Sequence, residues 1–161
     1  MDRGMLMFYN MGEITDWETE NSILDVQIAK SYLSDLENYT LPLDVALPIY
    51  RWAAIYRNTR LFKLVHQLST DELADSSNYA LVAPKRYKVK TNTILRGHFL
   101  EPHDQIKTEA VNYSQLVIAT KLLCDHLPLA TRSVVFYHLE EKTIQHFSAA
   151  QLNAITDLFT K

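Results

Sequence analysis

The stretch Met5-Leu6-Met7-Phe8-Tyr9-Asn10 decides the fold class that we predict, because two further runs in the chain repeat its pattern. Each run is apolar and ends in aromatic and polar residues. The other two runs are Val45-Ala46-Leu47-Pro48-Ile49-Tyr50-Arg51-Trp52 and Val134-Val135-Phe136-Tyr137-His138. Buried parallel strands have this composition, and ligand sites of strand-helix folds lie beyond the carboxyl ends of such strands. The pattern therefore predicts an α/β protein and the place of its site, but no reaction.

Helical patterns accompany these runs. The strands are expected at residues 5–10, 43–49 and 133–139. Apolar spacings of three and four residues predict helices at 22–39, 113–127 and 148–159. Ser22 and Ser148 are the expected N-caps of the first and last helix, and Ser69 caps a short helix at 70–75.

A hairpin is expected after the second strand. Residues 52–57 and 61–65 flank a turn at 58–60, although this turn lacks glycine. Residues 95–100 fit either a third strand of the parallel type or part of another hairpin. The hairpin at 52–65 carries arginine and lysine among aromatic side chains. This mixture fits either a flap over a bound ligand or an amphipathic cover for a sheet edge.

Composition excludes several classes of protein. The 161 residues carry a formal net charge of −3, which argues against a general nucleic-acid binder. Three glycines rule out a glycine-rich phosphate loop, and the single cysteine rules out a disulfide framework or cysteine-based zinc site. No signal peptide or membrane-length apolar window is found, so the chain as given is expected to be soluble. We expect no cofactor, and the sequence does not indicate where in the cell the protein is located.

Two phrases resemble a known family. Residues 2–12 (DRGMLMFYNMG) and 41–52 (LPLDVALPIYRW) are similar to the C-terminal part of uncharacterised bacterial proteins with a glycoside-hydrolase-like (β/α) barrel. Residues 134–139 resemble it more weakly. The resemblance implies that residues 1–161 form a single α/β domain that is the C-terminal half of a larger barrel. It also implies that an upstream acidic strand motif would supply the catalytic carboxylate.

The predicted fold class is therefore strand-helix units forming part of a (β/α)8-like barrel, with a β-hairpin insertion. Such a barrel needs eight strands and about 250 residues, so this chain alone is too short to close one. An open half would leave strand edges and an apolar face uncovered. The partners expected for it are a missing N-terminal half or a second copy of the chain.

The candidate ligand-binding residues lie at the expected strand ends. They are Tyr9, Asn10, Tyr50, Arg51, Trp52, Tyr137 and His138. Aromatic faces stack on the C–H surfaces of sugar rings, and polar side chains bond to hydroxyls, so this mixture fits a carbohydrate cleft. The alternative is that the aromatics only complete the core. Because side chains alternate along a strand, we favour Asn10 and His138 as the residues that face the site.

Acidic residues offer little catalytic chemistry. Glycoside hydrolysis normally needs two carboxylates, and Glu13 and Glu140 are the weak candidates near the predicted site. Both also fit solvated loop charges. Asp44 lies inside an apolar strand and needs a partner, for which Arg3, Arg96 and Arg132 are available. The six histidines form no metal-binding motif, so no metal site is predicted.

The functional prediction is a carbohydrate-related barrel segment that contributes ligand-binding residues without a complete catalytic set. This prediction depends on fold analogy more than on chemistry in the sequence. The alternative is a non-catalytic interaction or assembly protein. Such a protein would use the aromatic rim and the exposed strand edges to contact another chain.

Overall fold

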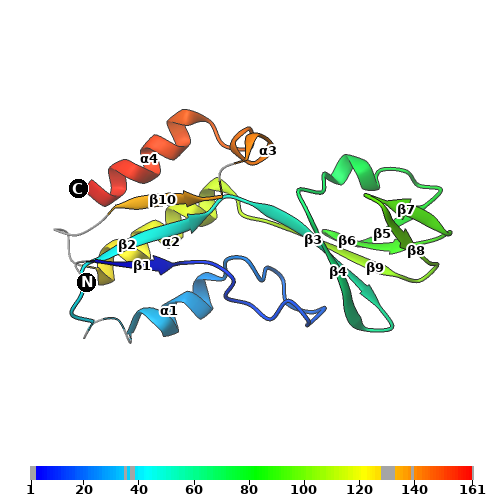
Figure 1. The fold of residues 1–161 in the computed structure, drawn as a ribbon, viewed down its shortest axis with the longest axis horizontal. Coiled ribbons are helices and arrows are strands. Elements are labelled where there is room, and N and C mark those ends of the chain that lie inside the picture. The colour runs from blue at the N-terminus through cyan, green and yellow to red at the C-terminus, as the bar shows by residue number, and fades with distance from the viewer. Residues whose placement is uncertain (1–2, 35, 37–38, 128–132, 139, 161) are drawn as a thin grey trace. The chain divides into compact units, whose positions relative to one another are not determined.

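The computed structural model describes residues 3–34, 36, 39–127, 133–138 and 140–160 (Figure 1). The chain forms two compact units. The parallel unit comprises Met1–Gly12, Ser22–Tyr50 and Val111–Lys161, and the antiparallel unit comprises Glu13–Asn21 and Arg51–Ala110. The chain enters the antiparallel unit twice and returns each time to the parallel unit.

The parallel unit contains a three-stranded sheet in the order β1-β2-β10. Its strands are β1 (Gly4–Met7), β2 (Leu43–Pro48) and β10 (Val134–Tyr137). The central strand β2 pairs in parallel with both neighbours. The predicted strands at 5–10, 43–49 and 133–139 and their common direction are thus confirmed, each strand being shorter than predicted. Leu139, at the end of the third prediction, lies outside the described residues.

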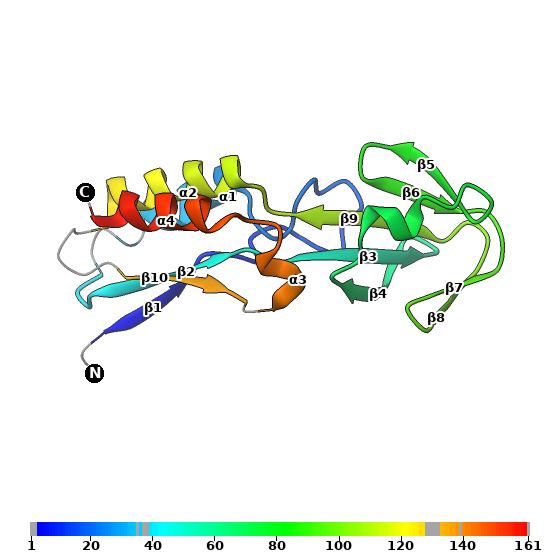
Figure 2. The same ribbon diagram turned by 90° about the horizontal axis from the view of Figure 1, so that it is seen from above.

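The helices of this unit are α1 (Val26–Ser34), α2 (Tyr113–His126), α3 (Glu141–Ile144) and α4 (Ala149–Thr160). Figure 2 shows α1, α2 and α4 on one face of the sheet. Capping boxes begin α2, through Asn112 and Gln115, and α4, through Ser148 and Gln151. The predicted helices at 113–127 and 148–159 are confirmed, and so is the cap at Ser148.

The first predicted helix begins later than expected. Asp25 Oδ1 accepts hydrogen bonds from the backbone N–H groups of Gln27 and Ile28, so Asp25 caps α1 in place of Ser22. Ser22 instead accepts a backbone hydrogen bond from Gly12 in a non-helical segment. The predicted end near residue 39 includes residues 35, 37 and 38, which lie outside the described part of the chain.

The face of the parallel sheet opposite the helices is apolar and open. Met5 (48% exposed) and Met7 (65%) project from it on β1, and Val135 and Tyr137 project from it on β10. Asp44 on β2 pairs with Arg3 at 2.7 Å, which confirms one of its three predicted partners. Arg96 instead pairs with Glu72, and Arg132 lies outside the described residues.

The antiparallel unit is built on a five-stranded sheet in the order β4-β3-β9-β6-β5. Its strands are β3 (Arg51–Arg57), β4 (Arg60–His66), β5 (Tyr79–Ala83), β6 (Arg86–Val89) and β9 (Gln105–Ala110). The predicted hairpin is confirmed as β3 and β4, joined at Asn58 and Thr59. Both turn residues have positive φ angles, as a two-residue hairpin of the primed type requires, even without glycine.

Two further elements complete this unit. The hairpin of β7 (Thr93–Leu95) and β8 (His98–Leu100) turns at Arg96-Gly97, both with positive φ. Residues 95–100 therefore form part of a hairpin, the second of the two alternatives. Ser69 caps the 3-10 helix η2 (Thr70–Leu73) through a capping box with Glu72, as expected for the N-terminus of this helix.

The predicted (β/α)8-like barrel is wrong. The parallel sheet has three strands and does not close, and the other sheets of the described chain are antiparallel. The hairpin predicted as an insertion is present, but the inserted segment is larger than predicted. Residues Arg51–Ala110 form a separate sheet with its own core. Antiparallel strands between residues 51 and 110 provide that sheet, where a barrel would require alternating parallel strands and helices.

The two faces of the five-stranded sheet are buried differently. One face packs into an apolar core that includes Ala53, Ile55, Val65 and Ile106. On the other face, Trp52 pairs in register with Glu109, and Ala54 with Lys107. Residues 13–21, which we call the strap, contact this second face. Tyr56 donates its hydroxyl to the Ile14 carbonyl, so the strap is fixed to the sheet by side chains.

A buried charged pair anchors the strap. The Lys107 ammonium lies 3.0 Å from Glu109 Oε1 and donates to the backbone carbonyls of Asp16 and Thr19. Glu109 also accepts from the indole N–H of Trp52 at 2.8 Å. Lysine and glutamate two residues apart on a strand share one face, which makes this arrangement geometrically natural. Both side chains are almost fully buried, and the compensating contacts are what make their burial tolerable.

Replacing Glu109 by glutamine tests this anchor. Glutamine keeps an acceptor for Trp52 but removes the negative charge beside the buried Lys107 ammonium. We expect Glu109→Gln to lower the free energy of unfolding by about 3 kcal/mol, measured by urea denaturation with tryptophan fluorescence. The matched control is Glu18→Gln, which removes a 76% exposed carboxylate from the neighbourhood of Arg86 and should cost less than about 1 kcal/mol. Equal losses for the two variants would contradict the prediction.

Candidate functional site

Three tyrosines meet at the carboxyl ends of the parallel strands. Tyr9 follows β1, Tyr50 follows β2, and Tyr137 ends β10. The rings of Tyr9 and Tyr137 stack with centroids 4.9 Å apart and an angle of 6° between their planes. Tyr50 meets both rings edge-on, at centroid distances of 6.1 and 5.8 Å. Because parallel strands end at the same edge of a sheet, the common direction of β1, β2 and β10 is what brings these three rings together.

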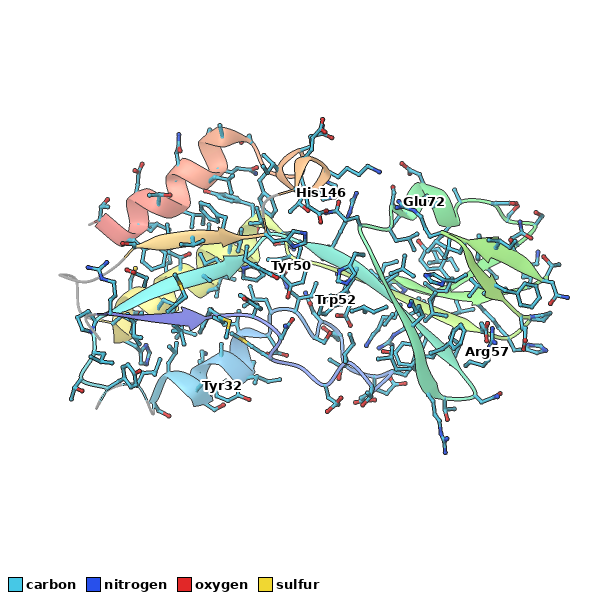
Figure 3. All side chains as sticks on the ribbon, viewed as in Figure 1. Tyr32, Tyr50, Trp52, Arg57, Glu72 and His146 are labelled. Carbon is cyan, nitrogen blue, oxygen red and sulfur yellow. The ribbon has the colours of Figure 1, made fainter. Side chains whose placement is uncertain are left out.

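The three rings differ in exposure. Tyr50 is 4% exposed and forms the base of the group, while Tyr137 is 45% exposed. Figure 3 labels Tyr50 at the end of β2. Edge-to-face and offset parallel contacts are the favoured aromatic geometries, so the cluster is held together by its own rings. Its solvent-facing part is therefore a preformed aromatic surface.

Polar groups border the aromatic surface. The Tyr50 hydroxyl donates to Asn10 Oδ1 at 2.6 Å. His138 Nε2 lies 2.6 Å from Glu140 Oε1, and its ring centroid lies 5.9 Å from that of Tyr50. We call Tyr9, Asn10, Tyr50, Tyr137, His138 and Glu140 together the tyrosine cluster. It combines aromatic faces with an amide, an imidazole and a carboxylate, which is a set suited to recognising a polyhydroxylated ligand.

The backbone at Asn10 explains how neighbours in sequence reach one cluster. Its φ of 57° lies in the left-handed region, which asparagine tolerates better than most residues. Its N–H donates to the Ile23 carbonyl at 2.7 Å, which fixes this conformation. Strict alternation therefore ends at Asn10, so Tyr9 and Asn10 both join the cluster. Asn10 and His138, which we favour as the residues that face the site, lie beside the stacked rings of Tyr9 and Tyr137.

The remaining predicted site residues belong to the antiparallel unit. Trp52, labelled in Figure 3, is 8% exposed and donates its indole N–H to Glu109. Arg51 begins β3, whose register with β9 starts at the pair Arg51 and Ala110. The sequence placed Arg51 and Trp52 with Tyr50 because the apolar run is continuous, but the chain passes from one unit to the other between Tyr50 and Arg51.

The two candidate carboxylates have different surroundings. The hydroxyl and backbone N–H of Thr15 both donate to Glu13, and these hydrogen bonds hold the pKa of the Glu13 carboxyl below its usual range. Glu13 therefore stays ionised and is a poor general acid. Glu140 belongs to the tyrosine cluster through His138. That cluster holds one carboxylate, fewer than the two that glycoside hydrolysis normally requires.

Sequence reasoning missed the buried pair Lys107 and Glu109. The sequence pattern predicts no element at residues 105–109, so neither charge has a predicted partner. The available signal was the spacing of two opposite charges with one residue between them in a potential strand. Among the described residues, no group of three or more histidine, cysteine or acidic side chains could hold a metal ion.

Comparisons with known proteins provide no relative. No family model, no curated protein and no solved structure matches this chain. In the part of the chain that the structure describes, none of the helices has both the length and the apolarity to span a bilayer. Arguments about function therefore depend on the geometry described above.

The tyrosine stack leads to a testable titration. Burial, and secondarily the neighbouring Tyr137 hydroxyl, raise the pKa of Tyr9 above the ordinary tyrosine value of about 10. The unfolded chain therefore ionises at this position before the folded chain does. As pH rises above about 10, wild type should lose folding stability relative to Tyr9→Phe.

Carbon-13 NMR of tyrosine-labelled protein measures the ionisation directly. The resonance that disappears in Tyr9→Phe should titrate with a midpoint above the ordinary tyrosine pKa. A midpoint at or below that value would show that the Tyr9 hydroxyl is not desolvated in the folded protein.

Proposed function

We propose that the tyrosine cluster binds a carbohydrate without hydrolysing it. The observation that carries this proposal is the preformed stack of Tyr9 and Tyr137 on the buried Tyr50, bordered by the polar groups of Asn10, His138 and Glu140. Sugar rings present apolar C–H faces and polar hydroxyls on the same small molecule. A half-exposed tyrosine face can stack on the first, and amide, imidazole and carboxylate groups can bond to the second.

The absence of a second carboxylate in the cluster favours binding over catalysis. Hydrolysis of a glycosidic bond requires an acid and a second carboxylate held at a defined separation. In the cluster, Glu140 is the one carboxylate and its Oε1 is engaged by His138. Recognition of the sugar needs none of this machinery. The function best supported is therefore that of a carbohydrate-binding module.

A titration with oligosaccharides tests the proposal. We would add cello-, xylo- and malto-oligosaccharides separately to nitrogen-15-labelled protein and follow the amide resonances of residues 9–10, 50 and 137–138. At least one sugar should shift these resonances. Tyr137→Ala should weaken its affinity about tenfold, which corresponds to about 1.4 kcal/mol. His138→Ala should weaken it by removing a polar contact.

Phe62→Ala provides the matched control. Phe62 and Tyr137 are equally exposed, each at 45%, but Phe62 lies on β4 of the antiparallel unit. This control should bind the sugar as wild type does. Absence of any response from wild type, or an equal loss in Phe62→Ala and Tyr137→Ala, would remove the tyrosine cluster from consideration as a sugar site.

A second candidate function is assembly with another polypeptide chain. The open face of the parallel sheet supports it, because Met5, Met7 and Val135 project there and no helix in the described part of the chain covers them. Parallel sheets are normally covered on both faces, and contiguous exposed apolar patches mark interaction sites. On this proposal the chain works as a non-catalytic interaction protein, and the tyrosine cluster contributes to its contact surface.

A further inference from the structure

The outer edge of β1 carries unpaired backbone hydrogen-bonding groups. Gly4 and Phe8 donate their N–H groups toward β2, to the carbonyls of Pro42 and Ala46. The intervening residues Met5 and Met7, and Tyr9 beyond them, direct their N–H and C=O groups to the opposite side, because these groups alternate along a strand. Among the described residues, none forms a hydrogen bond with the backbone of these three. Such an edge is a template for another strand.

Nothing in the sequence of this edge discourages pairing. Proteins usually protect exposed edges with charged residues, proline or a bulge. Residues 4–11 (GMLMFYNM) contain no charge and no proline. The edge strand β4 of the antiparallel unit differs, since it carries exposed Arg60, Lys63 and His66, and β5 has an irregular register between Leu81 and Ala83. Of the β1, β4 and β5 edges, the β1 edge is therefore the one that has neither exposed charges nor an irregular register.

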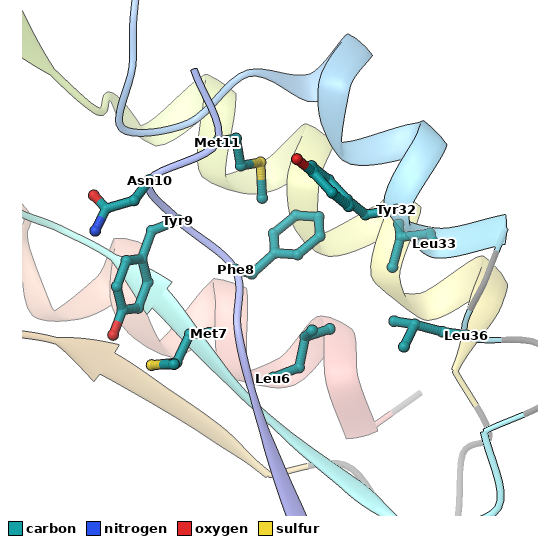
Figure 4. Close-up of a pocket in the computed structure, with 9 residues that line it drawn as sticks. All are labelled: Leu6, Met7, Phe8, Tyr9, Asn10, Met11, Tyr32, Leu33 and Leu36. Atoms are coloured by element: carbon teal, nitrogen blue, oxygen red, sulfur yellow. The ribbon is translucent and has the colours of Figure 1, made fainter. Parts of the chain in front are cut away.

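A cavity lies along the same edge. It has a volume of about 320 Å³ and lies between residues 6–11 on one side and Tyr32, Leu33 and Leu36 on the other (Figure 4). Phe8 and Tyr9 leave the strand on opposite sides in this view, with Phe8 toward α1. Tyr32 is 56% exposed although it lines an apolar cavity. A strand added beside β1 would close the cavity and cover this aromatic ring.

We propose that the β1 edge pairs with the β1 edge of a second copy of this chain. The two strands run antiparallel around a two-fold axis beside Met7, so that Met7 opposes its own copy and Met5 opposes Tyr9 of the other chain. The N–H and C=O groups of these three residues then all find partners. This inference deepens the assembly function, on which it rests, and it shares Tyr9 with the carbohydrate proposal.

The side chains agree with this register. Because residues 4–11 are uncharged, pairing the strand with itself brings no like charges together, whereas self-pairing of β4 would oppose basic side chains. Met5 and Met7 lie on the open face, and the pairing places the Met5 thioether beside a tyrosine ring, a favourable contact. Everything that the pairing requires is thus present on β1 itself, which is why a second copy is the occupant that we infer.

Sedimentation equilibrium of the full chain, at several concentrations, tests the pairing. Wild type should have twice the 18.6 kDa mass of the chain. Met7→Lys should be monomeric, because two lysines would meet at the two-fold axis, and Met7→Asp should be monomeric for the same reason. An equimolar mixture of the two variants should regain the dimer mass, since lysine then opposes aspartate.

Ile118→Lys is the matched control, because it places the same charge at an exposed position of α2, outside the open face, and should leave the dimer intact. Val135→Lys separates edge pairing from association through the open face, since it places the charge on that face but on β10; a dimer formed by edge pairing should tolerate it. Hydrogen exchange of wild type provides a measurement that needs no variant: the amides of Met5, Met7 and Tyr9 should exchange slowly at concentrations where the dimer forms and faster on dilution.

Four results would overturn edge pairing. The first three are a wild type that is monomeric at every concentration, a dimer that survives Met7→Lys, and rapid exchange of the three amides in the dimer. Loss of the dimer in both Met7→Lys and Val135→Lys would also overturn it, because association would then occur through the open face. That last result would still support the assembly function, so failure of edge pairing can be distinguished from failure of the assembly function.

Discussion

The parallel pairing of β2 with both β1 and β10 is the constraint on which the parallel unit depends. Two parallel neighbours require two crossover connections, and α1 and α2 belong to these connections. With α1, α2 and α4 on one face, none of the described helices covers the other face, and β1 and β10 are the outer strands of the sheet. The same pairing aligns the carboxyl ends of the strands, so one geometric fact produces both the tyrosine cluster and the open apolar face.

The second unit depends on a different kind of interaction. The Lys107 and Glu109 side chains are buried, and the backbone carbonyls of the strap satisfy the lysine. Tyr56 and Arg86 also donate to strap carbonyls, so side chains of the sheet perform a task that backbone pairing performs elsewhere. A loop without regular structure can be held in one conformation in this way, because five of its carbonyls accept hydrogen bonds from side chains of the sheet. The buried Lys107 and Glu109 side chains thus fix the position of the strap, although removing their charges from water costs free energy.

These features separate two functional surfaces of the parallel unit. The tyrosine cluster is preformed, since its rings support one another and Asn10 is fixed by backbone and side-chain hydrogen bonds. A preformed site loses little entropy on binding a small ligand, which suits weak polar and stacking contacts with a sugar. The β1 edge instead offers backbone groups and an apolar cavity, which suit a strand. Tyr9 belongs to both surfaces, so occupancy of one is expected to affect the other.

The sequence by itself determined the three parallel strands, the helices α2 and α4 and the hairpin of β3 and β4, because apolar periodicity, caps and turns are local signals. It also identified Tyr9, Tyr50 and Tyr137 at the strand ends. Long-range pairing, by contrast, determines that no barrel forms, that Arg51 and Trp52 belong to the antiparallel unit, and that Lys107 lies beside Glu109. These outcomes depend on which distant segments pair, and the energy of that pairing comes from contacts that no local pattern encodes. Residues 43–57 show the difference: one continuous apolar run becomes two strands in two units.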